Sequence, residues 1–128
     1  MTTVREIMSA ELVTVDPSVN LMQAAHLMSV GHVGSVLVLE GTGSLVGIFT
    51  ERDILQALAA HPKADSARTS SVSKGMTRDP VTINPNASVG EALDLMLSRG
   101  FRHLPVMQGD TLVGVVSMRD LAKSLAKE

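Results

Sequence analysis

A chain of 128 residues, 45% of them hydrophobic, has the length of one compact domain and enough apolar side chains for its core. The formal net charge of −2 and the presence of just two aromatic residues, Phe49 and Phe101, argue against a nucleic-acid-binding surface, while the absence of cysteine excludes disulfide bonds and a thiol nucleophile. No apolar run reaches the roughly 18 residues that a membrane helix needs, and no signal core is found, so we expect a cytoplasmic protein that does not bind membranes.

The first half of the chain predicts, in order, a helical turn, a strand, a helix, a pair of strands and another helix. Val4–Met8 suits the turn, and the apolar run Leu12–Val15 suits the first strand. Asn20 and Gln23 have the spacing of a capping box, which predicts that a helix begins there. The elements expected after it are strands over Ser35–Leu39 and Leu45–Phe49 and a helix from about Glu51 to Ala60.

The second half repeats this order. One constant offset pairs Met8 with Met76 and Pro17 with Pro85. After a hairpin loop that is one residue shorter in the second copy, Gly47-Ile48-Phe49-Thr50-Glu51-Arg52-Asp53 returns as Gly114-Val115-Val116-Ser117-Met118-Arg119-Asp120. The expected elements are Val72–Met76, Pro80–Ile83, a helix capped by Ser88 and Glu91, Leu104–Met107, Leu112–Val116 and about Met118 to Ala126. The chain is therefore an internal duplication.

This duplication predicts the domain organisation. Residues 1–60 and 72–128 form the two repeats, and the polar segment 61–71 between them is expected to be a loosely structured linker. A repeat of this size alone buries only roughly 60% of its unfolded surface and is marginally stable. We therefore expect one co-folded α/β (α+β) module, in which two β-α-β-β-α repeats pack with pseudo-two-fold symmetry.

Two hydroxyl–carboxylate pairs stand where a strand is expected to end and a helix to begin. They are Thr50 with Asp53 and Ser117 with Asp120. This spacing is that of a capping box, in which the two side chains satisfy free N–H groups of the first helical turn. The same junction also suits a nucleotide, because a helix amino terminus attracts phosphate and a carboxylate accepts hydrogen bonds from a ribose diol. The two interpretations are compatible, and both stay open.

Other reactive side chains give no comparable pattern. The four histidines, at positions 26, 32, 61 and 103, lack the spacing of metal ligands, and no Ser-His-Asp set or carboxylate pair indicates catalysis. The eight methionines are spread over the expected helices and strands, as is typical of core residues. We therefore expect neither a metal site nor an enzyme.

The order of elements, the segments Ile7-Met8-Ser9 and Gly75-Met76-Thr77, the Leu104-Pro105-Val106 strand and the duplicated motif together resemble the cystathionine-beta-synthase (CBS) domain. The tandem pair covers essentially the whole chain and is similar to a Bateman module of the stand-alone bacterial or archaeal type. The resemblance implies two sites for adenosine compounds. In these sites Asp53 and Asp120 would bind ribose hydroxyls, with Thr50 and Ser117 close to the ribose and phosphate.

The resemblance also implies crossed sites, in which the aspartate of one repeat faces the adenine pocket of the other. Site one is then expected to contain Ile48, Thr50, Arg52, Asp53, Thr77, Val81, Phe101, Arg102 and His103. Site two is expected to contain Ser9, Val13, Val33, Gly34, Ser35, Val115, Ser117, Arg119 and Asp120. Met8 and Met76 would flank the two adenine pockets.

The two sites are not expected to be equal. Arg102 and His103 in the second repeat correspond to the uncharged pair Gly34 and Ser35 in the first. Members of the resembled family often place basic residues at this position, and an arginine forms charge-assisted hydrogen bonds to phosphate that are roughly twice as strong as neutral ones. We expect site one to take a phosphorylated ligand, and site two to be empty or to hold a less charged adenosine compound.

Together these features predict a non-enzymatic sensor of AMP, ADP, ATP, NAD or S-adenosylmethionine, with no obligatory cofactor and a role in energy sensing or signal transduction. The resemblance further implies a homodimer formed through helical faces, to which Val30, Leu55, Leu58 and Leu125 could contribute, and an output through a separate client protein. A structural dimerisation module without a physiological ligand is the alternative, and an enzyme acting on nucleotides is a third possibility.

Overall fold

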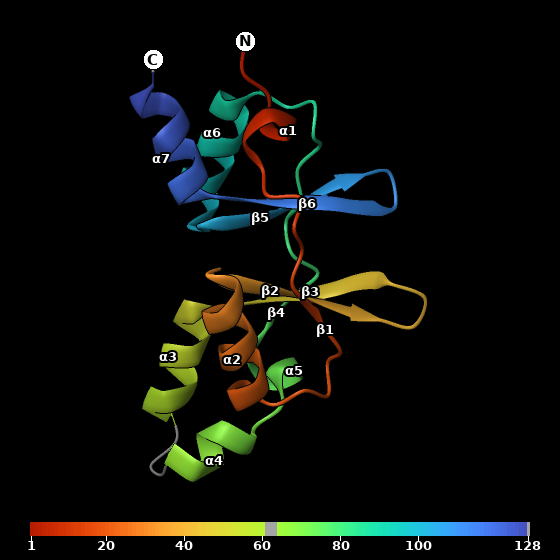
Figure 1. Ribbon diagram of the computed structural model, residues 1–128, viewed down its shortest axis with the longest axis vertical. Coiled ribbons are helices and arrows are strands. Elements are labelled where there is room, and N and C mark those ends of the chain that lie inside the picture. Colours follow the sequence, from red (N-terminus) through yellow and green to blue (C-terminus); the bar gives the residue numbers. More distant parts are fainter. Residues whose placement is uncertain (61–63, 128) are drawn as a thin grey trace. The chain divides into compact units, whose positions relative to one another are not determined.

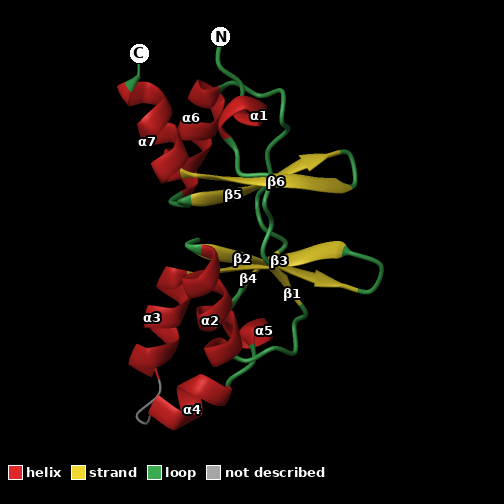
Figure 2. Ribbon diagram, viewed as in Figure 1, coloured by secondary structure: helices red, strands yellow, loops and turns green. Residues whose placement is uncertain are grey.

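The computed structural model describes residues 1–60 and 64–127, which divide into two compact units. Unit 2 runs from Val13 to Pro80, whereas unit 1 combines Met1–Leu12 with Val81–Glu128. Each unit contains both helices and β-strands (Figure 1 and Figure 2). The α/β class expected from the sequence is therefore confirmed.

In the described residues, unit 2 is built on a four-stranded sheet of order β1-β2-β3-β4. Its first strand pairs in parallel with β2, and the remaining neighbours are antiparallel. Figure 1 shows α2 and α3 on one face of this sheet, where they contact each other. The strands are β1 (Thr14–Val15), β2 (Ser35–Glu40), β3 (Ser44–Thr50) and β4 (Thr77–Arg78), and the helices are α2 (Leu21–Gly31), α3 (Glu51–Ala60), α4 (Ala64–Thr69) and α5 (Val72–Gly75).

Unit 1 is built on an antiparallel hairpin that is extended on both sides by single β-bridges. Ile83 forms a parallel bridge with Val106, and Ser9 forms an antiparallel bridge with Val115. These bridges correspond to β1 and β4 of unit 2. The elements of this unit are α1 (Val4–Ile7), α6 (Val89–Arg99), β5 (His103–Gln108), β6 (Thr111–Ser117) and α7 (Met118–Ala126).

Each unit thus completes its sheet with a segment from the other sequence repeat. The β4 strand belongs by sequence to the second repeat, yet it pairs with β3. Ser9 belongs to the first repeat, yet its N–H donates to Val115 O over 2.9 Å and its carbonyl accepts from Val115 N over 3.0 Å. The compact units are therefore not the same as the sequence repeats 1–60 and 72–128.

Two sequence-based expectations about local structure are wrong. Part of the expected loose linker is the helix α4, whose Ala67 is fully buried and which contacts α2 and α3. Alanine loses no side-chain entropy when it is buried, so a short polar helix can dock through one such residue. The strand expected over Pro80–Ile83 is reduced to the bridge at Ile83. Pro105 of the neighbouring strand has no N–H to donate to Val81, whereas the corresponding Leu37 in unit 2 donates to Val13 O over 2.9 Å. Residues 61–63 lie outside the described part of the chain.

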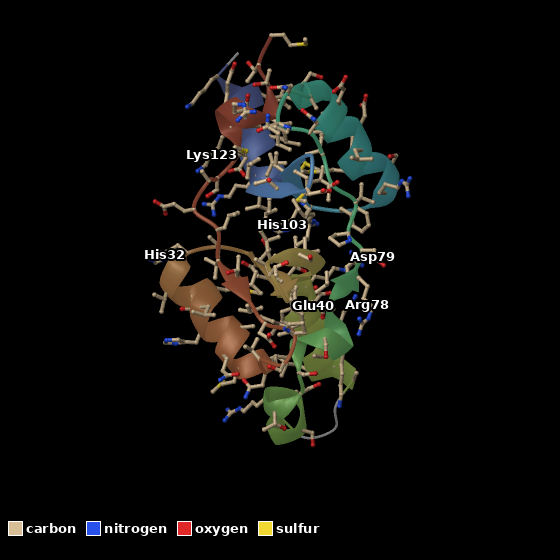
Figure 3. The ribbon with its side chains drawn as sticks, turned by 90° about the vertical axis from the view of Figure 1, so that its right-hand side faces the viewer. His32, Glu40, Arg78, Asp79, His103 and Lys123 are labelled. Atoms are coloured by element: carbon tan, nitrogen blue, oxygen red, sulfur yellow. The ribbon has the colours of Figure 1, made fainter. Side chains whose placement is uncertain are left out.

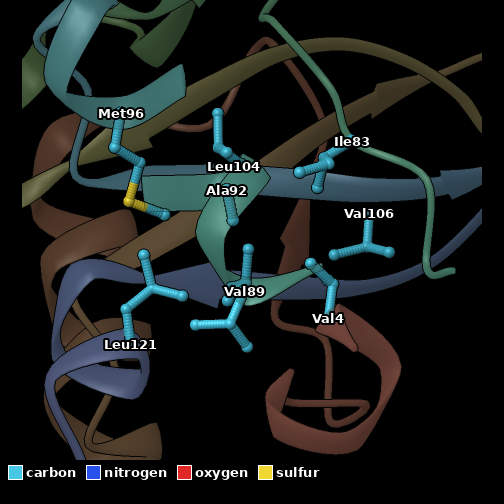
Figure 4. Packing of buried hydrophobic residues seen from close by; sticks show 9 residues of the cluster. Val4, Ile83, Val89, Ala92, Met96, Leu104, Val106 and Leu121 are labelled. Carbon is cyan, nitrogen blue, oxygen red and sulfur yellow. The ribbon is translucent and has the colours of Figure 1, made fainter. Parts of the chain in front are cut away.

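Each unit has its own apolar core. Figure 4 shows the core of unit 1, in which Val4 from the beginning of the chain packs with residues of its second half. The members of this core are Val4, Ile83, Val89, Ala92, Met96, Leu104, Val106, Val116 and Leu121. The core of unit 2 contains Val15, Leu21, Ala24, Met28, Val36, Val38, Phe49, Val72 and Met76.

The capping motifs that were predicted at two helix starts are present, one in each unit. The capping boxes expected at Asn20 with Gln23 and at Ser88 with Glu91 are both formed. The turns before them are closed by Asx hydrogen bonds. In unit 2 the hydroxyl and N–H of Ser18 donate to Asp16 over 2.7 and 2.9 Å, and these bonds lower the pKa of Asp16 below its ordinary value.

The ends of α2 and α6 differ in one residue type, which leads to a stability prediction. Helix α2 ends at His32 in the left-handed conformation (φ 54°), where α6 ends at Gly100 (φ 74°). A Cβ atom disfavours this conformation, so we expect His32→Gly to raise the free energy of unfolding by about 0.5–1 kcal/mol. Urea denaturation should show the gain, and Gly100→His should show a loss of similar size. Equal stabilities for the three proteins would contradict the explanation.

Candidate functional site

The first hydroxyl–carboxylate pair joins the end of β3 to the start of α3. The N–H of Thr50 donates to Asp53 Oδ2 over 2.8 Å, and its hydroxyl lies 3.1 Å from the same oxygen. In return, the N–H of Asp53 donates to Thr50 Oγ1 over 3.4 Å. Both side chains are partly buried. The pair therefore closes the first turn of α3 and stays partly open to solvent.

The second pair has the same geometry between β6 and α7. The N–H of Ser117 donates to Asp120 Oδ2 over 2.8 Å, and the N–H of Asp120 donates to Ser117 Oγ over 3.1 Å. The capping box expected here is thus formed. Within residues 1–60 and 64–127, no hydrogen bond to the other carboxylate oxygen of Asp120 is found. Capping consequently leaves one oxygen of this half-buried carboxylate available to a ligand hydroxyl.

The backbone around Thr50 is held by two neighbouring segments of unit 2. Ser35, which is buried, lies opposite Thr50 in the β2–β3 ladder, and the N–H of Glu51 donates to Gly34 O over 3.1 Å. Two residues before Thr50, Ile48 of β3 lies opposite Thr77 of β4. The loop before β2 and the strand β4 therefore both border the Thr50–Asp53 motif.

The backbone around Ser117 is held in the same way in unit 1. His103, which is labelled in Figure 3, is half-buried on β5 and lies opposite Ser117 in the β5–β6 ladder. The N–H of Met118 donates to Arg102 O over 2.8 Å. Ser9 lies opposite Val115, two residues before the motif. The side chain of Arg102 is exposed. The backbone of Arg102 and His103 thus borders the Ser117–Asp120 motif at the start of α7.

The residues expected to form each crossed site are divided between the units. Of site one, Ile48, Thr50, Arg52, Asp53 and Thr77 lie in unit 2, whereas Val81, Phe101, Arg102 and His103 lie in unit 1. Of site two, Ser9, Val115, Ser117, Arg119 and Asp120 lie in unit 1, whereas Val13, Val33, Gly34 and Ser35 lie in unit 2. Inside each unit the structure brings members of both expected sites together. The joining of residues from both units in one site stays a prediction.

This grouping inside a unit was missed in the sequence, and the hairpin loops alone do not reveal it. The short loop of a hairpin fixes which residues face each other across its strands. In the first repeat that register sets Ser35 opposite Thr50, and in the second it sets His103 opposite Ser117. Counting outward from each loop does not give these pairs, because a bulge shifts each ladder by one residue, between Val38 and Leu39 and between Val106 and Met107.

The glycine that opens each motif is in close contact with a methionine. A Cβ atom on Gly114 would lie 2.6 Å from Met8 Sδ and 2.8 Å from Ser9 O. At Gly47 the same atom would collide with Met76 Sδ and lie 3.1 Å from Thr77 O. In each unit we call the segment that comes from the other sequence repeat the exchanged segment, residues 8–9 in unit 1 and 76–77 in unit 2. The absence of a side chain at the two glycines lets this segment lie against the hairpin.

A hollow of about 390 Å³ opens beside α7 in unit 1. It is lined by Thr2, Glu6, Ile7, Asp120, Lys123, Ser124 and Lys127. Among the described residues that line this hollow, Asp120 is the one that was expected in a ligand site. Lys123, which also lines the hollow, is labelled in Figure 3. Asp120 thus borders accessible space as well as the first turn of its helix.

Over 1–60 and 64–127, no three side chains of His, Asp or Glu gather closely enough to hold a metal ion. None of the helices in the same residues has both the length and the apolarity required to cross a bilayer. His61 lies outside the described part of the chain.

Comparisons with known proteins agree with the duplicated architecture. The sequence profile of the CBS domain matches residues 4–60 and again residues 70–127. The chain is 37% identical over 122 residues to the CBS domain-containing protein YhcV of Bacillus subtilis, which covers 95% of this chain and 84% of that protein.

Solved structures share the fold over nearly the full length. A CBS-domain-containing protein of Agrobacterium tumefaciens superimposes with a TM-score of 0.90 at 31% identity, covering 97% of this chain and 93% of that one. A second match is a CBS domain pair crystallised in complex with 5′-methylthioadenosine and S-adenosyl-L-methionine. Its TM-score is 0.86 at 26% identity, and the match covers 97% of this chain and 99% of that one.

Proposed function

The chain belongs to the CBS-domain family, and from this premise we propose that it is a cytoplasmic, non-enzymatic regulatory module that binds an adenosine nucleotide. Both of its CBS domains carry the hydroxyl–carboxylate motif at the start of a helix. The ligands of the CBS pair that is 26% identical, 5′-methylthioadenosine and S-adenosyl-L-methionine, both contain adenosine. Adenosine is therefore the ligand moiety that we assign to this chain.

One observation carries the proposal, and it concerns Asp120. One of its oxygens accepts the N–H of Ser117, and the other lies at the amino terminus of α7 without a hydrogen bond from the described residues. A carboxylate in this position accepts hydrogen bonds from the two hydroxyls of a ribose, and the helix terminus attracts the phosphate beside it. A capping box alone needs only one of the two oxygens.

Arg102 suggests which unit takes the phosphorylated ligand. Its backbone is bonded to Met118 beside the Ser117–Asp120 motif, and its guanidinium group is exposed. A guanidinium forms forked hydrogen bonds to phosphate, whereas the corresponding Gly34 in unit 2 brings no charge. We infer that Arg102 and His103 act with Ser117 and Asp120 on a nucleotide phosphate. The motif of unit 2 would then take a less charged adenosine compound or none.

Regulation requires that ligand binding change the state of the protein. A ligand at 100 times its dissociation constant stabilises the form that binds it by about 2.7 kcal/mol. We propose that this energy shifts the shape of a homodimer and, through it, the affinity for a separate client protein. Self-association is supported by exposed apolar side chains on the helices, which include Val30, Leu55, Leu58 and Leu125.

A thermal-shift panel tests the proposal. AMP, ADP, ATP, NAD and S-adenosylmethionine are added to the wild type, and we expect at least one of them to raise the melting temperature, on the order of 10 °C at 100 times its dissociation constant. Asp120→Asn keeps an oxygen for the capping bond but loses the carboxylate charge, so it should reduce this rise. Ser88→Ala removes a matched capping box outside the expected sites and should lower the baseline while keeping the rise.

The alternative is a structural dimerisation module in which the two motifs only cap helices. The complete capping geometry at both positions favours it. If no compound in the panel changes the melting temperature at millimolar concentration, this alternative replaces the sensor. An enzyme acting on nucleotides would instead convert them during incubation, and chromatography of the incubated nucleotides would detect the products.

A further inference from the structure

The hollow beside α7 lies between two helices of unit 1, α1 and α7, which contact each other (Figure 1). Its volume of about 390 Å³ falls within the range of about 300–1,000 Å³ that is typical of small-molecule sites. The hollow is therefore large enough for a small organic ligand. The first side of it is lined by Thr2, Glu6 and Ile7, and the second by Asp120, Lys123, Ser124 and Lys127.

Three charged side chains of the hollow lack a protein partner in the described chain. Over 1–60 and 64–127, no ion pair or hydrogen bond is found for the carboxylate of Glu6 or for the ammonium groups of Lys123 and Lys127. The two lysines are four residues apart, which sets them on the same side of α7. Asp120 differs from these residues, because its carboxylate caps α7 at the positive end of the helix dipole. A ligand in the hollow thus meets two ammonium groups and one carboxylate that no described side chain neutralises.

The duplication shows that the fold does not require these three charges. Lys123 and Lys127 correspond to the uncharged Gln56 and Ala60 in the first repeat, and Glu6 corresponds to Lys74, a charge of opposite sign. Cations near the carboxyl end of a helix stabilise it through the helix dipole, yet α3 has no basic residue in its last turn. The charges are therefore specific to unit 1, and a role in binding would account for them.

The signs of these charges indicate the chemistry of the ligand. Two ammonium groups suit two carboxylates of one molecule, and the carboxylate of Glu6 suits an ammonium group of the same molecule. A purely anionic ligand would be repelled by Glu6, and a purely cationic one by the lysines. We propose that the hollow between α1 and α7 binds an acidic α-amino acid, of the type of L-glutamate or L-aspartate. This site is additional to the nucleotide motifs and does not rest on the proposed function.

An NMR titration tests the proposal with L-glutamate and L-aspartate as probes. Isotope-labelled protein is titrated at constant ionic strength, and the amide shifts of α1 and α7 are followed. We expect saturable shifts with at least one of the two amino acids. The double variant Lys123→Gln/Lys127→Gln should bind it about tenfold more weakly, which corresponds to the loss of two partly exposed ion pairs. Lys74→Gln, which removes an exposed lysine from unit 2, is the control and should bind as the wild type does.

Two analogues of L-glutamate test the role of each charged group. Glutarate lacks the ammonium group and L-alanine lacks the second carboxylate, so both should bind more weakly than L-glutamate. Glu6→Gln should weaken the binding of L-glutamate and strengthen that of glutarate, because the carboxylate attracts the ammonium group of the first and only repels the second. A variant that simply folds poorly would lose affinity for both compounds.

The proposal is contradicted if neither amino acid gives saturable shifts in the wild type at millimolar concentration. It is also contradicted if glutarate or L-alanine binds as tightly as L-glutamate, or if Glu6→Gln changes the binding of L-glutamate and glutarate in the same direction. Equal losses of affinity in Lys74→Gln and in the lysine double variant would show a general effect of charge and would exclude the hollow as the site. None of these results affects the thermal-shift panel with nucleotides.

Discussion

Arg102→Ala is expected to weaken the binding of AMP about 10- to 100-fold and to leave the affinity for adenosine unchanged. The reason is that a charge-assisted hydrogen bond contributes about 1.5–3 kcal/mol, and each 1.4 kcal/mol corresponds to about tenfold in affinity. Adenosine has no phosphate and so gains nothing from the guanidinium group. Isothermal titration calorimetry with both compounds measures the difference. Arg99→Ala, which removes an exposed arginine from the end of α6, is the control and should bind both as the wild type does.

The same titrations can identify which aspartate, Asp53 or Asp120, binds the same ligand molecule as Arg102. If Arg102 serves the same ligand as Asp120, then Arg102→Ala should have no further effect on the binding that remains in an Asp120→Asn background. In an Asp53→Asn background it should keep its full effect. The opposite pattern would support the crossed sites implied by family resemblance. Equal losses for AMP and adenosine in the single variant would contradict a role for Arg102 in binding phosphate.

Gly114→Ala is expected to lower the free energy of unfolding by about 1–3 kcal/mol, the usual cost of overpacking a well-packed position. The new methyl group would lie 2.8 Å from the carbonyl oxygen of Ser9 and 2.6 Å from Met8 Sδ. The thioether of Met8 can rotate away, but Ser9 is held by two backbone hydrogen bonds to Val115. Relief therefore requires that the bridge between the exchanged segment and β6 be strained or broken.

Gly90→Ala is the matched control for this substitution. Gly90 lies in α6, where a Cβ atom would come within 3.8 Å of Ser88 Oγ, an ordinary contact distance. Because alanine has the higher helix propensity, this variant should be as stable as the wild type or more stable by up to about 1 kcal/mol. Urea denaturation of both variants gives the comparison. A Gly114→Ala protein as stable as the wild type would show that the approach of Met8 and Ser9 is not tight.

Much of the local structure could be predicted because the duplication supplied each signal twice. The expected helices Glu51–Ala60 and Met118–Ala126 have the observed bounds, and the capping boxes at Asn20 and Ser88 are formed. These features depend on residues within a few positions of one another, so periodicity and capping chemistry are sufficient to find them.

The arrangement around the candidate site was harder to predict, because it depends on long-range pairing. Nothing near Ser9 indicates that it will form a bridge with Val115 in the other repeat. The placement of Arg102 beside Ser117 follows from the hairpin register, but the resemblance assigned it to the motif of the first repeat. Helix α4 was missed because its polar sequence has the composition of a linker, although Ala67 is buried where the helix docks.

Native mass spectrometry with added AMP, ADP, ATP, NAD or S-adenosylmethionine tests the central claim most directly. The account predicts that the wild type retains at least one of these compounds, and that the double variant Asp53→Asn/Asp120→Asn retains none. A wild type that binds no adenosine compound at millimolar concentration, or a double variant that binds as well as the wild type, would contradict the account.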